Sequence, residues 1–168
     1  MSNSYVDIIE QAVSLLDDIS LADYQEVLTP HFSSSIGGHI RHIVDHFLAL
    51  KQASTSGEIN YNKRNRHADL EQFPQSAIAT CESITAWLEE TRSTQLLNQR
   101  VLVTTDIDIS HTKGTTCEST LERELVFVAS HAIHHYALIR IIRNMQGKAL
   151  PEFFGYASYT ISYITRSA

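Results

Sequence analysis

The sequence predicts an all-α fold, a four-helix bundle, and three observations support this prediction. The chain has 168 residues, 43% of them hydrophobic, with six Gly and three Pro, which fits a single domain over residues 1–168 with its own core. Four long segments carry apolar residues at spacings of three and four, the period of a helix. The segments contain no internal repeat and no low-complexity tract. Amphipathic helices of this kind pack into a bundle.

The first two predicted helices each have one apolar face. The first covers residues 4–28 and is followed by Pro30; its apolar positions are Ile8, Ile9, Ala12, Leu15, Leu16 and Ile19. The second covers about residues 36–53, and Ser34 or Ser35 is its N-cap, because a serine hydroxyl accepts a hydrogen bond from the first turn. The apolar positions of the second helix are Ile36, Ile40, Ile43, Phe47 and Leu50.

The other two long helices have recognisable starts. The third starts near Pro74, and its apolar positions are Ile78, Cys81, Ile84, Trp87 and Leu88. The fourth opens with Ser119-Thr120-Leu121-Glu122, a capping-box pattern, and closes near Gly147. The apolar positions of the fourth helix are Leu121, Leu125, Val128, Ala132, Leu138 and Ile142.

The connections predict how the helices are joined. Roughly 18 residues separate the second helix from the third, enough to recross the bundle, so these two helices can run parallel. The stretch "RVLVTTDIDISHTKGTTCES" predicts a short hairpin before the fourth helix. The last stretch, "LPEFFGYASYTISYI", is too aromatic for a free tail. We expect it to pack on the bundle or on a second subunit, with Gly155 as the turn before a short C-terminal helix.

Charge and cysteine content exclude several classes of protein. With 13 Lys and Arg against 19 Asp and Glu, the formal net charge is −6, the wrong sign for binding a phosphate backbone. The first basic residue is Arg41, so the N-terminus lacks the basic segment of a secretory signal. Cys81 and Cys117 are isolated, which fits a reducing compartment. The sequence therefore predicts a cytoplasmic protein that binds neither nucleic acid nor a membrane.

Histidines are concentrated on two of the predicted helices. Six of the nine lie in "SIGGHIRHIVDHF" and "SHAIHHYALI", namely His39, His42, His46, His131, His134 and His135. Burying an imidazole without a partner costs on the order of 1–3 kcal/mol. Each of these side chains therefore needs an exposed position, a hydrogen-bond partner or a metal ion.

Two histidines of the fourth helix are spaced to share a ligand. His131 and His135 are four residues apart and point the same way on a helix, whereas His134 is turned aside. At a Cβ separation of about 5–6 Å, both imidazoles can reach one metal ion with bonds of about 2.0–2.1 Å. A third ligand must then come from another segment. The alternative is that His131 and His135 are core histidines, hydrogen-bonded to the backbone or to Glu124.

The two histidine segments, "SIGGHIRHIVDHF" and "HAIHH", resemble the DinB/YfiT-like superfamily of metal-dependent enzymes. Members of that family are four-helix bundles in up-down-down-up order with a three-histidine metal site. The resemblance implies that one metal ligand lies seven residues after a capping Ser and three before an Asp, which selects His42 between Ser35 and Asp45. It implies that the other two ligands are the first and last histidines of the H-x-x-H-H run, His131 and His135.

The family pattern also suggests a function. In many members Arg-Gly-Gln follows the last histidine, whereas this chain has Tyr136-Ala137-Leu138. We therefore expect the part of the site that contacts the substrate to differ from that of those members. The resemblance implies a metal-dependent enzyme acting on a small molecule, as a thiol-dependent S-transferase or isomerase or as a hydrolase. Its cofactors would be Zn²⁺ or Ni²⁺ and a low-molecular-weight thiol. The alternative is a non-catalytic, stress-associated helical bundle with vestigial or weak metal binding.

The residue types also favour one kind of metal site over others. Three neutral imidazoles leave the charge of a divalent ion uncompensated and at least one coordination position open, which is typical of a catalytic site. A ferritin-like di-iron centre needs paired Glu-x-x-His motifs, and no Glu in this chain has a His three residues later. A C-x-x-C-H motif for c-type haem is absent from the sequence too.

Five further side chains are candidates for supporting roles. His46 and His134 would transfer protons or contact the ligands, and His39 would contact the ligands, with a surface position as the alternative for all three. Arg64 and Arg66 lie in "NYNKRNRH" on the long connection. If this connection folds over the metal, either arginine would bind an anionic substrate; otherwise it is a solvated loop. The expected partners are a small-molecule substrate and a second copy of the chain, in a homodimer.

Overall fold

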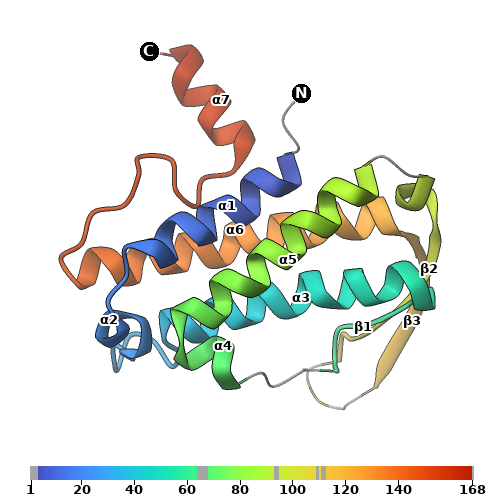
Figure 1. The fold of residues 1–168 in the computed structure, drawn as a ribbon, viewed down its shortest axis with the longest axis horizontal. Helices are drawn as coiled ribbons and strands as arrows, with labels where there is room; N and C mark the ends of the chain where they lie inside the picture. The colour runs from blue at the N-terminus through green and yellow to red at the C-terminus, as the bar shows by residue number, and fades with distance from the viewer. Residues whose placement is uncertain (1–3, 64–67, 93–94, 109, 111–112, 168) are drawn as a thin grey trace.

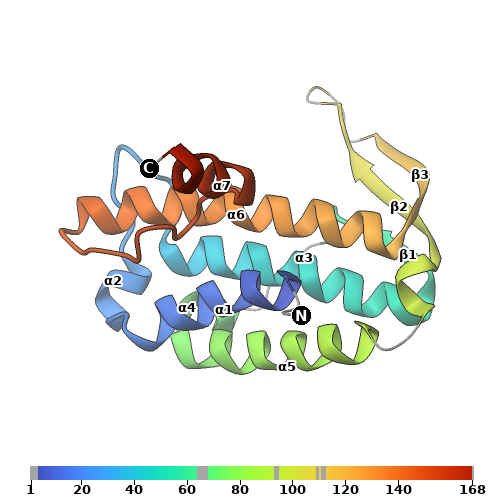
Figure 2. The same cartoon turned by 90° about the horizontal axis from the view of Figure 1, so that it is seen from above.

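The computed structural model describes residues 4–63, 68–92, 95–108, 110 and 113–167, which form a mostly helical protein with one small sheet (Figures 1 and 2). Four long helices lie side by side: α1 (Ser4–Asp17), α3 (Ile36–Ser56), α5 (Pro74–Arg92) and α6 (Leu121–Met145). Helix α1 packs on α5, and α3 packs on both α5 and α6. In Figure 1, α3 and α5 both begin at the end of the molecule that holds α2 (Leu21–Gln25) and α4 (Ala68–Gln72).

The predicted first helix is broken in two, which corrects the expectation of one helix over residues 4–28. Helix α1 ends at Asp17, and Ser20 adopts an extended conformation as the N-cap of α2. The Ser20 hydroxyl accepts a hydrogen bond from the backbone N–H of Asp23 at 3.1 Å. The turn brings Tyr24 into the core, where its hydroxyl donates to the carbonyl of Leu70. At this point the serine cap is therefore more favourable than continuation of the helix.

The starts and ends of the other long helices follow from local signals. Ser35 caps α3 and accepts from the Gly38 N–H at 3.1 Å, and α5 begins at Pro74, as predicted. Helix α6 is capped by Thr120. Ser119, the first residue of the predicted capping box, donates its hydroxyl instead to Oε1 of Glu124 at 2.7 Å. Helix α6 closes just before a glycine in the left-handed region, as predicted.

A three-stranded sheet corrects the prediction of a purely all-α fold. The predicted hairpin is confirmed as antiparallel strands β2 (Arg100–Asp106) and β3 (Gly114–Thr120). The third strand, β1 (Glu58–Asn60), directly follows α3 and pairs in parallel with β2. The short 3₁₀ helix η1 (Gln95–Asn98) precedes β2. The sheet lies at the end of the bundle where α3 ends and α6 begins (Figure 1).

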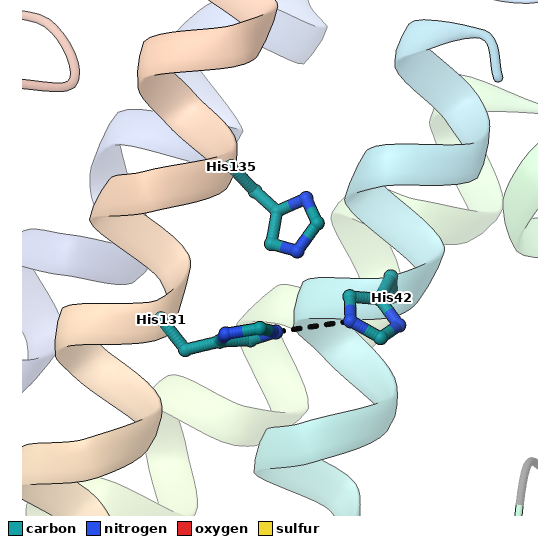
Figure 3. Close-up of side chains that lie close together, drawn as sticks. All are labelled: His42, His131 and His135. Atoms are coloured by element: carbon teal, nitrogen blue, oxygen red, sulfur yellow. Dashed lines mark hydrogen bonds between the residues drawn. The ribbon is translucent and has the colours of Figure 1, made fainter. Parts of the chain in front are cut away.

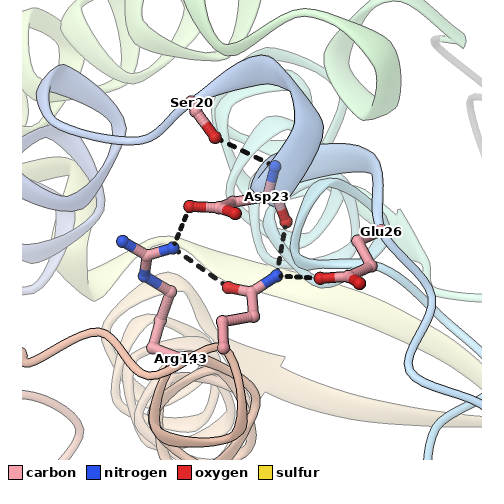
Figure 4. Close-up of polar contacts among 5 residues, drawn as sticks. Ser20, Asp23, Glu26 and Arg143 are labelled. Carbon is pink, nitrogen blue, oxygen red and sulfur yellow. Dashed lines mark hydrogen bonds and ion pairs between the residues drawn. The ribbon is translucent and has the colours of Figure 1, made fainter.

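A polar cluster ties the end of α6 to α2 (Figure 4). Nη1 of the buried Arg143 donates to Oδ2 of Asp23 at 2.9 Å and to Oε1 of Gln146 at 3.0 Å. Gln146 in turn donates to the Asp23 carbonyl and to the Glu26 carboxylate. The hydrogen bond from Arg143 lowers the pKa of Asp23, so the carboxylate stays charged opposite the guanidinium.

The C-terminal segment packs on the bundle only in part. Phe154 is buried against Tyr136, with ring centroids 5.3 Å apart, and Gly155 turns the chain at a φ of +72° before α7 (Ser158–Ser167). Helix α7 projects from the bundle in Figure 1, and Tyr159 and Tyr163 are 80% and 73% exposed. Docking on the chain's own bundle is therefore confirmed for Phe154 and not seen for these two tyrosines, and docking on a second subunit stays a prediction.

Helix α6 passes a simple test for a membrane span. Among the described residues it is the helix that is long and apolar enough to cross a membrane by length and composition. The core helix of a soluble protein passes the same test. Leu125, Val128 and Ile139 of α6 are buried in the core of this chain.

Candidate metal centre

Three histidines converge between α3 and α6. His42 comes from α3, and His131 and His135 come from neighbouring turns of α6 (Figure 3). One nitrogen from each ring can be chosen so that all three nitrogens lie within 4.8 Å of one another. The rings are half-buried, so they lie at the edge of the core. The structure thus brings together the three residues that the sequence nominated as ligands, and the cluster could hold a metal ion.

Core packing fixes where these rings point. On α3, Ile43 next to His42 is buried, and on α6 the same holds for Ala132 and Tyr136, which follow the two histidines. The Tyr136 hydroxyl donates to the carbonyl of Ile8 at 2.9 Å, which locks the rotation of α6 about its axis. Because the helices are anchored by these contacts, the histidines meet at their common edge whether or not an ion is bound.

Hydrogen bonds already join the histidines in pairs. Nε2 of His42 and Nε2 of His131 are 2.9 Å apart, and Nδ1 of His39 and Nδ1 of His135 are also 2.9 Å apart. In each pair one ring nitrogen donates and the other accepts, so at least one ring of each pair must be neutral. His39 was predicted as a contact of the ligands or a surface residue, and not as a ligand. Its position three residues before His42 was the only sequence signal for it.

The surroundings keep the α6 histidines neutral. Burial, followed by the neighbouring His46 and His134, lowers the pKa of His131 to about 4. Burial, followed by His42 and the other histidines of the cluster, lowers the pKa of His135 to about 3. A neutral imidazole has the free electron pair that a metal ion needs. The donor set of three convergent imidazoles therefore fits a borderline-soft divalent ion such as Zn²⁺.

We predict that the metal-free protein loses stability as the pH falls from about 6.5 to about 4. In the unfolded chain both α6 histidines bind their protons near pH 6.5, whereas in the fold they bind them only near pH 3–4. The unfolded state therefore holds more protons in this window. The free energy of unfolding of the metal-free protein therefore falls as the pH falls through this window.

Urea unfolding of the chelator-treated protein at several pH values measures this dependence. A His131→Gln/His135→Gln variant, which carries neutral side chains at both positions, is expected to lose much of the slope between pH 6.5 and pH 4. An unchanged slope in this variant would contradict the assignment of the pH dependence to these two residues.

A second network borders the cluster on the side of the sheet. His46 donates from Nδ1 to the carbonyl of His42 at 2.8 Å, and its ring stacks on Tyr61 with centroids 5.2 Å apart. The Tyr61 hydroxyl donates to the buried Glu124 at 2.8 Å, and burial together with this bond raises the pKa of Tyr61. Glu124 also accepts from Arg123. Since its carboxylate is engaged with these partners, the alternative that Glu124 pairs with His131 or His135 is wrong.

The remaining predicted residues lie away from the three ring nitrogens or outside the description. His134 is exposed, and its ring centroid is 5.4 Å from that of His135. Arg64 and Arg66 lie outside the described residues. The two cysteines are free, with Cys81 buried in the core and Cys117 exposed on β3. Tyr61 could not be found from the sequence, since it follows a strand of only three residues.

Comparisons with known proteins match the chain to a family, to a solved structure and to a longer protein. A family model for the DinB superfamily matches residues 6–139, which include all three convergent histidines. A solved structure of the DinB-like protein YjoA from Bacillus subtilis superposes with a TM-score of 0.56, covering 92% of this chain and 100% of that one, at 19% sequence identity. A protein of Rhizopus delemar named FK506-binding protein 5 is 34% identical over 108 residues, 64% of this chain. This chain spans 28% of the length of that protein.

Proposed function

Since this chain belongs to the DinB superfamily, we propose that it is a metal-dependent enzyme that acts on a small molecule. His42, His131 and His135 would hold one divalent ion, Zn²⁺ or Ni²⁺. The observation that carries the proposal is the convergence of one nitrogen from each of three rings, two of them on the same helix and one across the helix interface. Two of these rings are held neutral, and no carboxylate belongs to the set.

The bound ion would supply a Lewis acid that lowers the pKa of a water or a thiol at an open coordination position. The chain's own residues would exclude water and move protons. Residues of the core exclude water from the back of the site, where Ile43 and Ala132 are buried. His46 is fixed through Nδ1 on the carbonyl of His42, so its other ring nitrogen would accept or return a proton. His134, which is exposed, is the other candidate for proton transfer, in direct exchange with solvent.

The reaction class we propose is transfer or isomerisation that depends on a low-molecular-weight thiol, with hydrolysis as the related case. A thiol becomes a good nucleophile only as its thiolate, and a cationic centre among neutral imidazoles favours that form. If Arg64 and Arg66 fold over the site, they would bind an anionic group of the substrate.

A non-catalytic bundle is the second candidate, and one observation favours it. In each of the rings of His39, His42, His131 and His135, one nitrogen is paired with a nitrogen of another ring through two hydrogen bonds, without an ion. Such a cluster would be a stable polar element of the helix interface, with weak metal binding as a by-product.

The remaining features of the proposal concern the whole protein. We propose the up-down-down-up helix order of the family, and the common starting end of α3 and α5 in Figure 1 supports it. We propose that the protein is cytoplasmic. We also propose that it forms a homodimer, which the exposed Tyr159 and Tyr163 on α7 support. Light scattering of the purified chain measures its mass in solution.

Elemental analysis tests the metal proposal directly. Purified without chelator or histidine tag, the protein is expected to bind about one divalent ion per chain. Substoichiometric uptake that does not change in His131→Ala would end the metal proposal. Activity is then compared between metal-loaded and chelator-treated protein, by following loss of free thiol from cysteine or glutathione in the presence of chlorodinitrobenzene and related electrophiles. Stoichiometric metal without metal-dependent thiol consumption would favour the non-catalytic bundle.

A further inference from the structure

We propose that His39 is a positioning residue of the metal centre, which holds Nδ1 of His135 and thereby leaves Nε2 of His135 to face the ion. The inference rests on the proposed function only for the presence of the ion. The contact between His39 and His135 is present without an ion, so an experiment can refute the positioning role of His39 independently of the proposed function.

The geometry of the pair is set by the same helix interface as the ligands. His39 lies on α3 three residues before His42, and His135 lies on α6 four residues after His131. Their Nδ1 atoms are 2.9 Å apart, and their ring planes are inclined at 48°. Nε2 of His39 is buried and has no hydrogen-bond partner among the described residues. The contact with His135 is thus what orients the His39 ring.

When His135 donates this hydrogen bond, the bond determines which nitrogen of His135 is available to an ion. A metal-bound imidazole uses the electron pair of one nitrogen and carries its proton on the other. With Nδ1 engaged by His39, the nitrogen left for the ion is Nε2, the same atom type through which His42 and His131 approach each other. Figure 3 shows this nitrogen of His135 directed toward the other two rings. Without His39, a half-turn of the His135 ring would present Nδ1 instead.

Proton positions follow from this arrangement. When Nε2 of His135 holds the ion, its proton lies on Nδ1 and is donated to Nδ1 of His39. His39 must then carry its own proton on Nε2, so both rings stay neutral and each has a single tautomer. Ligand histidines in metalloproteins are commonly held by such an outer partner, whose loss typically weakens metal binding 10–100-fold.

Nuclear magnetic resonance of protein labelled with ¹⁵N-histidine reads the tautomers directly, through long-range ¹H–¹⁵N correlations. In the Zn²⁺-loaded protein we expect His135 with a protonated Nδ1 and a metal-bound Nε2, and His39 with a protonated Nε2. A metal-bound Nδ1 on His135 would overturn the proposal.

Three variants separate positioning from a structural role. His39→Phe keeps a ring of similar size and removes the hydrogen bond, and its Kd for Zn²⁺ is expected to rise about 10–100-fold. His39→Gln restores a polar group that can reach Nδ1 and is expected to recover part of the affinity. His134→Phe is the control, because it alters a neighbouring histidine outside the pair, and its Kd should change less than twofold. Equal Kd values for His39→Phe and His134→Phe would refute the role of His39.

The metal-free protein gives an answer even if no ion binds. Wild type is expected to show one His135 tautomer with a slowly exchanging ring proton, and His39→Phe is expected to show a mixture of tautomers. Absence of Zn²⁺ binding in wild type would end the proposed function, and the tautomer comparison would still decide on His39. Indistinguishable His135 signals in the two metal-free proteins would overturn the positioning role. Circular dichroism confirms that each variant is folded.

Discussion

Replacement of His135 by Ala is expected to abolish the stabilisation of the protein by Zn²⁺ or Ni²⁺. An ion that binds only the folded state contributes RT ln(1 + [L]/Kd), about 2.7 kcal/mol at a hundredfold excess over Kd. For a chain of this size, that corresponds to a rise in melting temperature of about 5–11 °C. Two imidazoles, those of His42 and His131, hold an ion much more weakly than three, so the His135→Ala variant should show no comparable rise. Melting curves with chelator and with added metal measure the difference.

His134→Ala is the matched control for this experiment. His134 lies next to His135 on α6 but is exposed and is not one of the three convergent rings. Its variant should keep the full metal-dependent rise. If the cluster is only a polar element of the core, His135→Ala would be less stable with or without metal, because the hydrogen bond to His39 is lost in both cases. Equal metal-dependent shifts in wild type and both variants would rule out His135 as a ligand.

The proximity of His131 and His135 on α6 was predictable because it depends on helix geometry alone. Residues four apart lie on one face of any helix, so His131 and His135 had to be neighbours. The sequence could not show by geometry which histidine of α3 meets this pair. His39, His42 and His46 share one wedge of α3, and their spacing does not say which turn meets α6. The resemblance to a family selected His42. In the structure His39 lies against His135, His42 lies against His131, and the ring of His46 stacks on Tyr61.

The errors in the predicted fold have local causes that periodicity does not detect. Strand β1 has three residues, too few for an alternating pattern, and it forms because its partner β2 lies nearby in space. The break after α1 depends on one capping hydroxyl, that of Ser20, inside a stretch of otherwise helical composition. Where a capping signal stood next to a change in pattern, as at Ser35 and Pro74, the helix start was predicted correctly.

The network around Glu124 shows why a buried carboxylate is hard to assign from sequence. Glu124 lies on α6, the helix that carries His131 and His135, so it was considered as a partner for them. Its side chain turns instead to the sheet, where it binds the hydroxyls of Tyr61 and Ser119 and the guanidinium of Arg123. The partners come from three segments, and two of these belong to strands or their ends. Only the folded chain places them together.

Phe154→Ala is expected to lower the free energy of unfolding by about 3–5 kcal/mol, the usual cost of deleting a buried aromatic ring. Phe154 is 4% exposed and packs on Tyr136, the residue that follows His135. The next residue, Gly155, approaches so closely that an added Cβ would lie 2.7 Å from the backbone of Tyr136. Arg140 donates to the carbonyls of Glu152 and Phe154 and fixes the segment on α6. Equilibrium unfolding in urea measures the change.

Tyr159→Ala is the control for Phe154→Ala, because it removes an aromatic ring a few residues later that is 80% exposed. In a monomer its effect should stay within about 0.5 kcal/mol, as for most surface substitutions. A loss in Tyr159→Ala that grows with protein concentration would instead place α7 against a second copy, since only association depends on concentration. A change below about 0.5 kcal/mol in Phe154→Ala would mean that the segment after Leu150 does not stabilise the bundle. The stability of α6 behind the metal centre would then depend on the helix contacts alone.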